Sequence, residues 1–324
     1  MKKTITSILF YLAIASVCFA QQAPQYSLYM WNKHVFNPAY AGMENSLSIT
    51  GVYRSQWLNL PGSPETQTVN AHMPLYIAGG GVGISFENES IGSWKQSAAT
   101  LSYNYQMLMG KSGVLSIGLS AGLIQRELDG AKIRTPEGEI IEGEYISHND
   151  PLLPFLGVER GLAPTVGLGA FYQGEKLEVG LSAINLLENE VSLSKVTFKP
   201  ERTYYLYLGY KLSLGRKLEI LPSALLKSDV YQTQMDFSAI VRYNENISIG
   251  ASFRGYDSNS QDAVAILAGI KLSEKINLGY AYDLTLSGLS NVSTGTHEIL
   301  LNYNLGKPVG KGKPPIIIYN PRSL

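Results

Sequence analysis

The fold is decided by the stretch Gly113–Arg126, which reads GVLSIGLSAGLIQR. From Leu115 to Leu123 every second residue is apolar, and the residues between them are serine or glycine. Successive side chains of a β-strand point to opposite faces, so this pattern predicts a strand with one apolar and one polar face. Such a strand suits a boundary between lipid and a polar interior.

The same alternation recurs along the chain and predicts fourteen strands. Each is about ten residues long, enough for a tilted strand to cross the bilayer core. No apolar run after residue 20 is long enough for a membrane-spanning helix. Pro222 falls inside the ninth strand, where it cannot donate to the ladder, so we expect a bulge or a rim position there. The predicted strands cover residues 46–54, 66–74, 80–88, 96–107, 113–126, 165–173, 176–185, 202–212, 217–227, 233–243, 246–254, 262–272, 275–283 and 296–305.

The predicted connections differ in length from one side to the other. Those after the even-numbered strands are short turns, such as residues 213–216 and 244–246. Those after the odd-numbered strands are mostly longer, including residues 88–95 and, longest of all, 127–164. Bacterial outer-membrane barrels have short periplasmic turns and longer external loops. The sequence therefore predicts an all-β fold, a transmembrane outer-membrane β-barrel of about 14 antiparallel strands, with both termini in the periplasm.

The N-terminus has the features of an export signal. Lys2 and Lys3 precede the apolar run Ile5–Val17, and Ala20 provides the small residue of a cleavage site. This is typical of a secretory signal peptide, and the run is too short to span a bilayer as a helix. A buried N-terminal helix is one alternative. A lipoprotein cleaved before Cys18 is another, although the residues before this cysteine fit such a signal poorly.

We therefore expect four parts along the chain. Residues 1–20 form a signal peptide, and residues 21–45 form an N-terminal periplasmic or plug-like segment. Residues 46–305 form the β-barrel, and residues 306–324 form a basic tail rich in proline and glycine that lies in the periplasm. Lipid of the outer membrane is then the first partner of the barrel.

Composition argues against several kinds of chemistry. Cleavage after residue 20 removes the only cysteine, and the net charge falls from zero to −2 because Lys2 and Lys3 leave and no acidic residue does. Neither disulfide chemistry nor a general affinity for nucleic acid is expected. The four histidines show no spacing typical of a metal site, so we expect no metal and no cofactor. They are His34, His72, His148 and His297.

A catalytic set can be assembled only loosely. Ser290, His297 and Asp283 surround one external loop and could be combined as a serine hydrolase triad. Fourteen strands bring many such residues to a rim by chance. We therefore expect a protein that is not an enzyme.

Charged residues at polar positions of the alternation are expected to face the lumen. Acids and bases are both present, so they can pair across the interior. Such a barrel is either cross-linked and plugged or a selective pore, and we favour the plugged form because the segment 21–42 can enter a lumen of this size. The charged residues are Arg54, Lys211, Lys227, Asp236, Arg242, Asp283 and Glu298.

Several short motifs, spread over the mature chain, resemble the PorP/SprF family of outer-membrane proteins of the type IX secretion system. One lies in the N-terminal segment, one in the first strand and the loop after it, one in the ninth strand, and the last two near the C-terminal end of the barrel. The residues that carry the resemblance are Asn37, Pro38, Ala39, Tyr40, Gly42, Tyr53, Arg54, Gln56, Trp57, Pro222, Ser223, Lys227, Tyr282, Asp283, Ser287, His297 and Glu298.

The resemblance implies a function that composition cannot. Such proteins are accessory barrels of the secretion and gliding machinery, and they help particular surface proteins, including adhesins, to reach or stay on the cell surface. They associate with periplasmic ring components and a peptidoglycan-binding partner, and they have no known catalytic role. The motifs do not separate a core secretion component from a paralogue dedicated to one adhesin. The alternation alone also allows a general porin or a channel for hydrophobic solutes.

A pair of adjacent substitutions tests the assigned faces of residues 113–126. Leu119→Arg places a charge on the lipid face and should cost roughly 2–4 kcal/mol of folding free energy. Ser120→Arg places the same charge in the lumen and should insert normally apart from crowding. Folding yield into lipid vesicles measures the difference, and equal yields would show that the faces are assigned wrongly.

Overall fold

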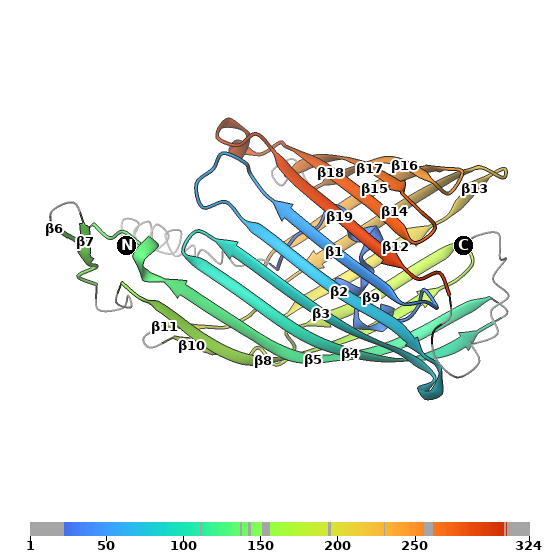
Figure 1. Cartoon of the computed structure of the whole chain (residues 1–324), viewed down its shortest axis with the longest axis horizontal. Coiled ribbons are helices and arrows are strands. Elements are labelled where there is room, and N and C mark those ends of the chain that lie inside the picture. Colours follow the sequence, from blue (N-terminus) through green and yellow to red (C-terminus); the bar gives the residue numbers. More distant parts are fainter. Residues whose placement is uncertain are drawn as a thin grey trace, which may run out of the picture.

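The computed structural model describes residues 23–110, 112–136, 138–141, 144–150, 156–193, 196–229, 231–255, 262–307 and 309. It is a closed barrel of fourteen antiparallel strands, as the sequence predicts (Figure 1). Each strand pairs with its neighbours along the chain, and β1 pairs with β19 to close the ring. The barrel strands are β1 (Ser48–Ser55), β2 (Glu65–Leu75), β3 (Gly80–Ile91), β4 (Trp94–Met109), β5 (Gly113–Asp129), β8 (Val158–Gln173), β9 (Leu177–Ile184), β12 (Thr203–Tyr210), β14 (Leu218–Ser228), β15 (Thr233–Tyr243), β16 (Ile247–Arg254), β17 (Ala263–Lys271), β18 (Ile276–Thr285) and β19 (Thr296–Asn304).

Short elements complete the described chain. Five strands of three or four residues lie outside the set of fourteen: β6 (Glu139–Ile141), β7 (Glu144–Ser147), β10 (Val191–Leu193), β11 (Val196–Phe198) and β13 (Leu212–Leu214). Six 3-10 turns are η1 (Tyr29–Trp31), η2 (Lys33–Val35), η3 (Pro38–Tyr40), η4 (Tyr76–Ala78), η5 (Gly130–Lys132) and η6 (Gly288–Asn291). Within the described residues, no helix has the length and apolar character needed to cross a membrane.

Three details differ from the sequence-based expectation. β8 begins at Val158 rather than at residue 165, because pairing with β5 continues through Gly161 and Pro164, which interrupt the alternation. The expected loop at 88–95 is a two-residue turn between β3 and β4. Pro222 lies on no bulge. The pairing of β14 with β12 ends at Ser223. In the same register, β14 then pairs with β13 from Ile220 onward. Pro222 lies in the gap between these two pairings, where the N–H that proline lacks is not needed for the ladder.

The connections sort to the two ends of the barrel as expected. The loops after β1, β5, β9 and β18 lie at one end, which is the left end in Figure 1, and the short turns lie at the other. We call these the long-loop end and the short-turn end. The outer face is apolar and exposed, as at Leu101 (64%) and Leu119 (50%), whereas inward residues such as Asn104 (0%) are polar and buried.

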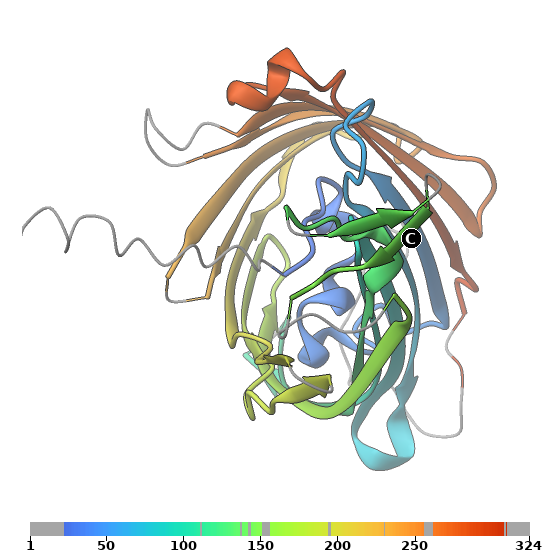
Figure 2. The same cartoon turned by 90° about the vertical axis from the view of Figure 1, so that its left-hand side faces the viewer.

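The lumen is filled by residues 23–47, which we call the plug. Figure 2 looks from the long-loop end and shows this blue segment inside the ring of strands. Tyr29 and Leu28 of the plug are fully buried, each at the centre of an apolar cluster with side chains of the wall. The plug contacts the wall closely at two glycines. A Cβ on Gly118 would lie 2.5 Å from the backbone nitrogen of Ala39, and a Cβ on Gly169 would lie 2.2 Å from the side-chain oxygen of Asn37.

The plug crosses the barrel from end to end. Ala23 lies beside Asp229 and Gln232 of the β14–β15 connection, at the long-loop end. Leu305, after β19, bonds to Leu47 at the short-turn end. Ala23 and Leu305 therefore lie at opposite ends of the barrel, and the location of both termini in the periplasm stays a prediction. The expected signal peptide (1–20) and nearly all of the expected tail (306–324) lie outside the described residues.

Two epitope insertions test this path. An epitope between Ala20 and Gln21 and a second one at the C-terminus should be accessible from opposite sides of the membrane, because Ala23 and Leu305 are at opposite ends of the barrel. Antibody binding to intact and to permeabilised cells makes the measurement, with an epitope in loop 130–157 as the control for the long-loop end. An N-terminal epitope that labels together with the C-terminal one would contradict the path.

Candidate functional site

Five charged side chains, from β1, β15, β16, β18 and β19, meet inside the lumen along the part of the wall that runs from β15 through β19 to β1. Arg54 contacts Asp283 and Glu298, each at 2.8 Å. Arg254 contacts Asp236 at 2.8 Å and Asp283 at 3.1 Å. All five are at most 6% exposed. Charges buried this deeply require partners, so the group is a single connected network.

The network holds the plug at Ser27 and Leu28. Glu298 accepts the backbone N–H of Ser27 at 2.7 Å and that of Leu28 at 3.0 Å. The Ser27 hydroxyl donates to Asp283 at 2.8 Å and accepts from both Arg54 and Arg254 at 3.0 Å. Three carboxylates face two guanidinium groups, so the plug supplies the donors that the extra carboxylate needs. We call these five side chains and Ser27–Leu28 the clamp.

A second attachment lies in the turn around η3. Asn37 caps η3 by accepting the N–H of Ala39 at 3.0 Å, and its amide donates to carbonyls of β8 and β9. Asn104 of β4 donates to the carbonyls of Ala39 and Ala41 at 2.9 and 2.6 Å. Gly42 has a φ of 70°, and a Cβ there would lie 2.7 Å from the carbonyl oxygen of Met73. The motif from Asn37 to Gly42 is therefore a docking turn that fits tightly against the wall.

Buried histidines lie between the plug and the wall. The rings of His34 and His72 are 5.2 Å apart, and His34 Nε2 is 2.8 Å from the Ser102 hydroxyl. Both imidazole rings are buried inside the barrel. In the part of the chain that the structure describes, no three His, Cys, Asp or Glu side chains are placed to hold a metal ion.

The remaining motif residues divide between the two faces of the wall. Ser223 contacts the Tyr29 hydroxyl at 3.1 Å, and Lys227 donates to the Ala23 carbonyl at 2.8 Å, so both hold the plug. Pro222 precedes Ser223 on the same strand. The other motif residues lie on the lipid face or at the long-loop rim. None of them forms a hydrogen bond or an ion pair with the described residues of the plug. They are Tyr53, Gln56, Trp57, Tyr282, Ser287 and His297.

The triad considered from the sequence is not assembled. Asp283 is buried in the lumen within the clamp. His297 is on the outer face of β19, where its Nδ1 is 2.6 Å from the Tyr280 hydroxyl. Asp283 and His297 therefore lie on opposite sides of the barrel wall, so they cannot act on one substrate with Ser290.

Two parts of the clamp were missed from the sequence. Arg254 occupies a polar position of a predicted strand, so the alternation that identified Arg54 would have found it. Ser27 and Leu28 carried no signal, because the plug has neither strand nor helix periodicity. The other predicted lumen charges, Lys211 and Arg242, are half-buried, and Arg242 pairs with Glu219.

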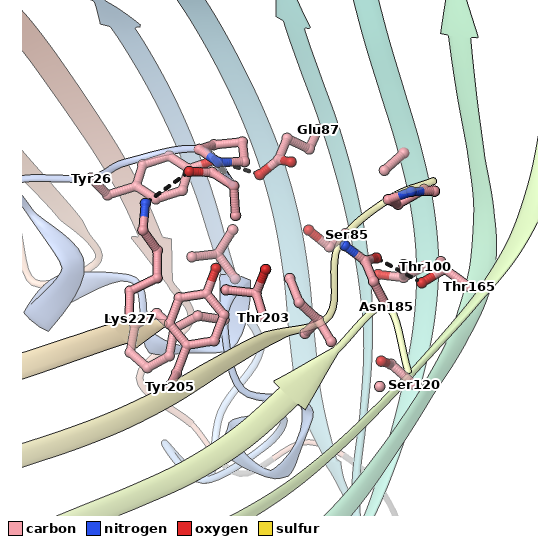
Figure 3. Close-up of a pocket in the computed structure, with 18 of the residues that line it drawn as sticks. Tyr26, Ser85, Glu87, Thr100, Ser120, Thr165, Asn185, Thr203, Tyr205 and Lys227 are labelled. Atoms are coloured by element: carbon pink, nitrogen blue, oxygen red, sulfur yellow. Dashed lines mark hydrogen bonds between the residues drawn. The ribbon is translucent and has the colours of Figure 1, made fainter. Parts of the chain in front are cut away.

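A cavity of about 1350 Å³, including the part open to solvent, lies beside the plug (Figure 3). Its floor is formed by plug residues 34–38, and its rim includes Glu201 and Thr203 near the long-loop end. Glu87 and Lys227 project into it from facing walls. The cavity is therefore a blind pocket that the plug closes toward the short-turn end.

Removing one carboxylate should weaken the clamp. Glu298→Ala removes one of the two carboxylates that pair with Arg54 and leaves two plug amides without their acceptor, and loss of one partner of a buried pair costs about 3–5 kcal/mol. The temperature at which the folded form converts to the slower-migrating unfolded form on gels should therefore fall. Ile299→Ala, one residue along on the lipid face, is the matched control and should shift it less. Equal shifts would show that the clamp does not stabilise the barrel.

Comparison with known proteins identifies the family. The family model described as "Type IX secretion system membrane protein PorP/SprF" matches residues 18–303. A search of the curated proteins finds no matching sequence.

Similar solved structures include Omp33 of Acinetobacter baumannii, with 9% identity, 80% of this chain and 98% of the other covered, and a TM-score of 0.45. The toluene transporter TbuX of Ralstonia pickettii has 9% identity, coverages of 85% and 92%, and a TM-score of 0.48. A TodX deltaS2S3 mutant monoaromatic hydrocarbon channel has 10% identity, coverages of 88% and 95%, and a TM-score of 0.44. The family model spans nearly the whole barrel and the plug, so the chain belongs to the PorP/SprF family of type IX secretion system membrane proteins.

Proposed function

We propose that this protein is a non-enzymatic accessory barrel of the type IX secretion system that helps particular surface proteins, including adhesins, to reach or stay on the cell surface. In this role the barrel serves protein secretion, gliding motility or both. Membership of the family across residues 18–303 supports an outer-membrane protein of this secretion system. The proposal goes further in assigning clients and an anchoring role.

The observation that carries the proposal is the plugged lumen. The clamp, the docking turn and the Lys227 contact fix the plug at three levels of the barrel. A route for solutes would need these buried bonds to break. The alternative, a porin or a channel for hydrophobic solutes, needs an open or easily opened lumen, so the plug favours a barrel that works through contacts.

In this proposal the two ends have different partners. The long-loop end faces the outside and meets the client, because external loops of bacterial barrels are the longer ones. The short-turn end faces the periplasm, where β19 ends. There the tail 306–324 and the turns would contact periplasmic ring components and a peptidoglycan-binding protein.

Deletion of the gene should deplete a subset of surface proteins while leaving other outer-membrane barrels in place. Protein composition of shaved cell surfaces, compared with total cell protein, makes the measurement, and the restored wild-type gene is the control. In planar bilayers the purified barrel should show no steady large openings. An unchanged surface together with steady conductance would contradict the proposal and favour the porin.

A further inference from the structure

The rim of the cavity beside the plug includes Glu201 and Thr203, near the long-loop end. Plug residues 34–38 close its other end. Its wall on β3, β4 and β5 carries small side chains, such as Ser85, Ala98 and Ser120, so the space is not filled by the wall itself. An occupant would therefore be a molecule, or the end of one, that is presented at the long-loop side.

One side of this cavity already holds a peptide segment without helix or strand structure, namely residues 23–26 of the plug. Lys227 donates to the carbonyl of Ala23 at 2.8 Å. The side chain of Gln25 bonds to Gln234 at 2.7 Å, and the Tyr26 hydroxyl donates to Glu87 at 2.6 Å. The wall thus captures a backbone carbonyl and polar side chains of a chain that lies along it.

The rest of the cavity is lined by groups that suit a second peptide. Hydroxyl and amide side chains project into it, each able both to donate and to accept a hydrogen bond, and two of them, Thr165 and Asn185, already bond to each other at 3.0 Å. Such groups can satisfy the N–H and C=O groups of a backbone without regard to its sequence. They are Ser85, Thr100, Ser120, Thr165, Asn185 and Thr203 (Figure 3).

The charge of the cavity selects among peptides. Glu87 accepts from Tyr26 and forms no ion pair within 4 Å with a described lysine, arginine or histidine, although Lys227 on the facing wall attracts it at longer range. Glu89 lies two residues along the same face of β3 and is 9% exposed, and Lys227 and Arg126 attract it at longer range. Lys227 is directed to a carbonyl instead. A half-buried carboxylate without a close counter-charge favours a cationic partner.

We propose that the cavity receives an extended segment of a partner polypeptide, which enters from the long-loop end and places a lysine or arginine against Glu87. The inference rests on the proposed function and names the chemistry by which a client would be recognised. A neutral oligosaccharide could use the same hydroxyl groups, but it would leave Glu87 without a counter-charge.

The test uses the full-length purified barrel and fluorescein-labelled ten-residue peptides of glycine and serine that carry either three lysines or three glutamates. Ala98→Phe fills the cavity, because Ala98 is directly opposite Glu87 in the β3–β4 register. Ala99→Phe is the matched control, because Ala99 faces lipid. Glu87→Gln removes the charge and keeps an acceptor for Tyr26.

The lysine peptide should bind saturably to the wild type and to Ala99→Phe, and at least tenfold more weakly to Ala98→Phe and Glu87→Gln. The glutamate peptide should not bind. Equal binding to the two phenylalanine variants, equal binding of both peptides, or displacement by maltohexaose but not by unlabelled lysine peptide would overturn the inference. If the gene deletion depletes surface proteins and the peptide results fail, the proposed function stands and only the cavity assignment is lost.

Discussion

The structure depends on a balance of buried charge at the centre of the barrel. Arg54 and Arg254 cannot neutralise Asp236, Asp283 and Glu298 completely, and all five side chains are buried. Two backbone N–H groups and one hydroxyl of the plug complete the set. Without the plug, a carboxylate would be buried with too few donors, and without the wall, the plug would lose its deepest attachment. Barrel and plug are therefore one folding unit.

The same dependence explains the composition of the inner wall. Inward positions on β3, β5 and β8 are often glycine, serine or alanine, and the plug backbone lies directly against several of them, as at Gly81 and Gly118. Larger polar side chains on this face would leave no room for a chain in the lumen. The small residues that alternate with leucine in residues 113–126 thus reflect the shape of the plug as well as the polarity of the interior.

The strands were predictable because lipid and lumen impose opposite demands on alternate residues. The prediction failed where that contrast is weak, at Gly161 and Pro164 in β8 and at the tight turn between β3 and β4. The polar alternation also placed Arg54, Asp236, Asp283 and Glu298 in the lumen. The path of the plug was not predictable, because its turns follow contacts with many strands rather than a local period. The motif residues from Asn37 to Gly42 came from family resemblance, and only the fold shows that they dock a turn.

One feature of the clamp bears on the order in which the molecule assembles. Arg54 on β1 is directly opposite Glu298 on β19, at the seam where the first and last strands close the ring. Glu298 also binds the plug, which precedes β1 in the chain and ends at the far side of the lumen. A chain end that must lie along the whole interior is enclosed more simply by a sheet that is still open than threaded through a finished one. Glu298 of the last strand can then bind the plug and Arg54 together as β19 pairs with β1 and closes the ring.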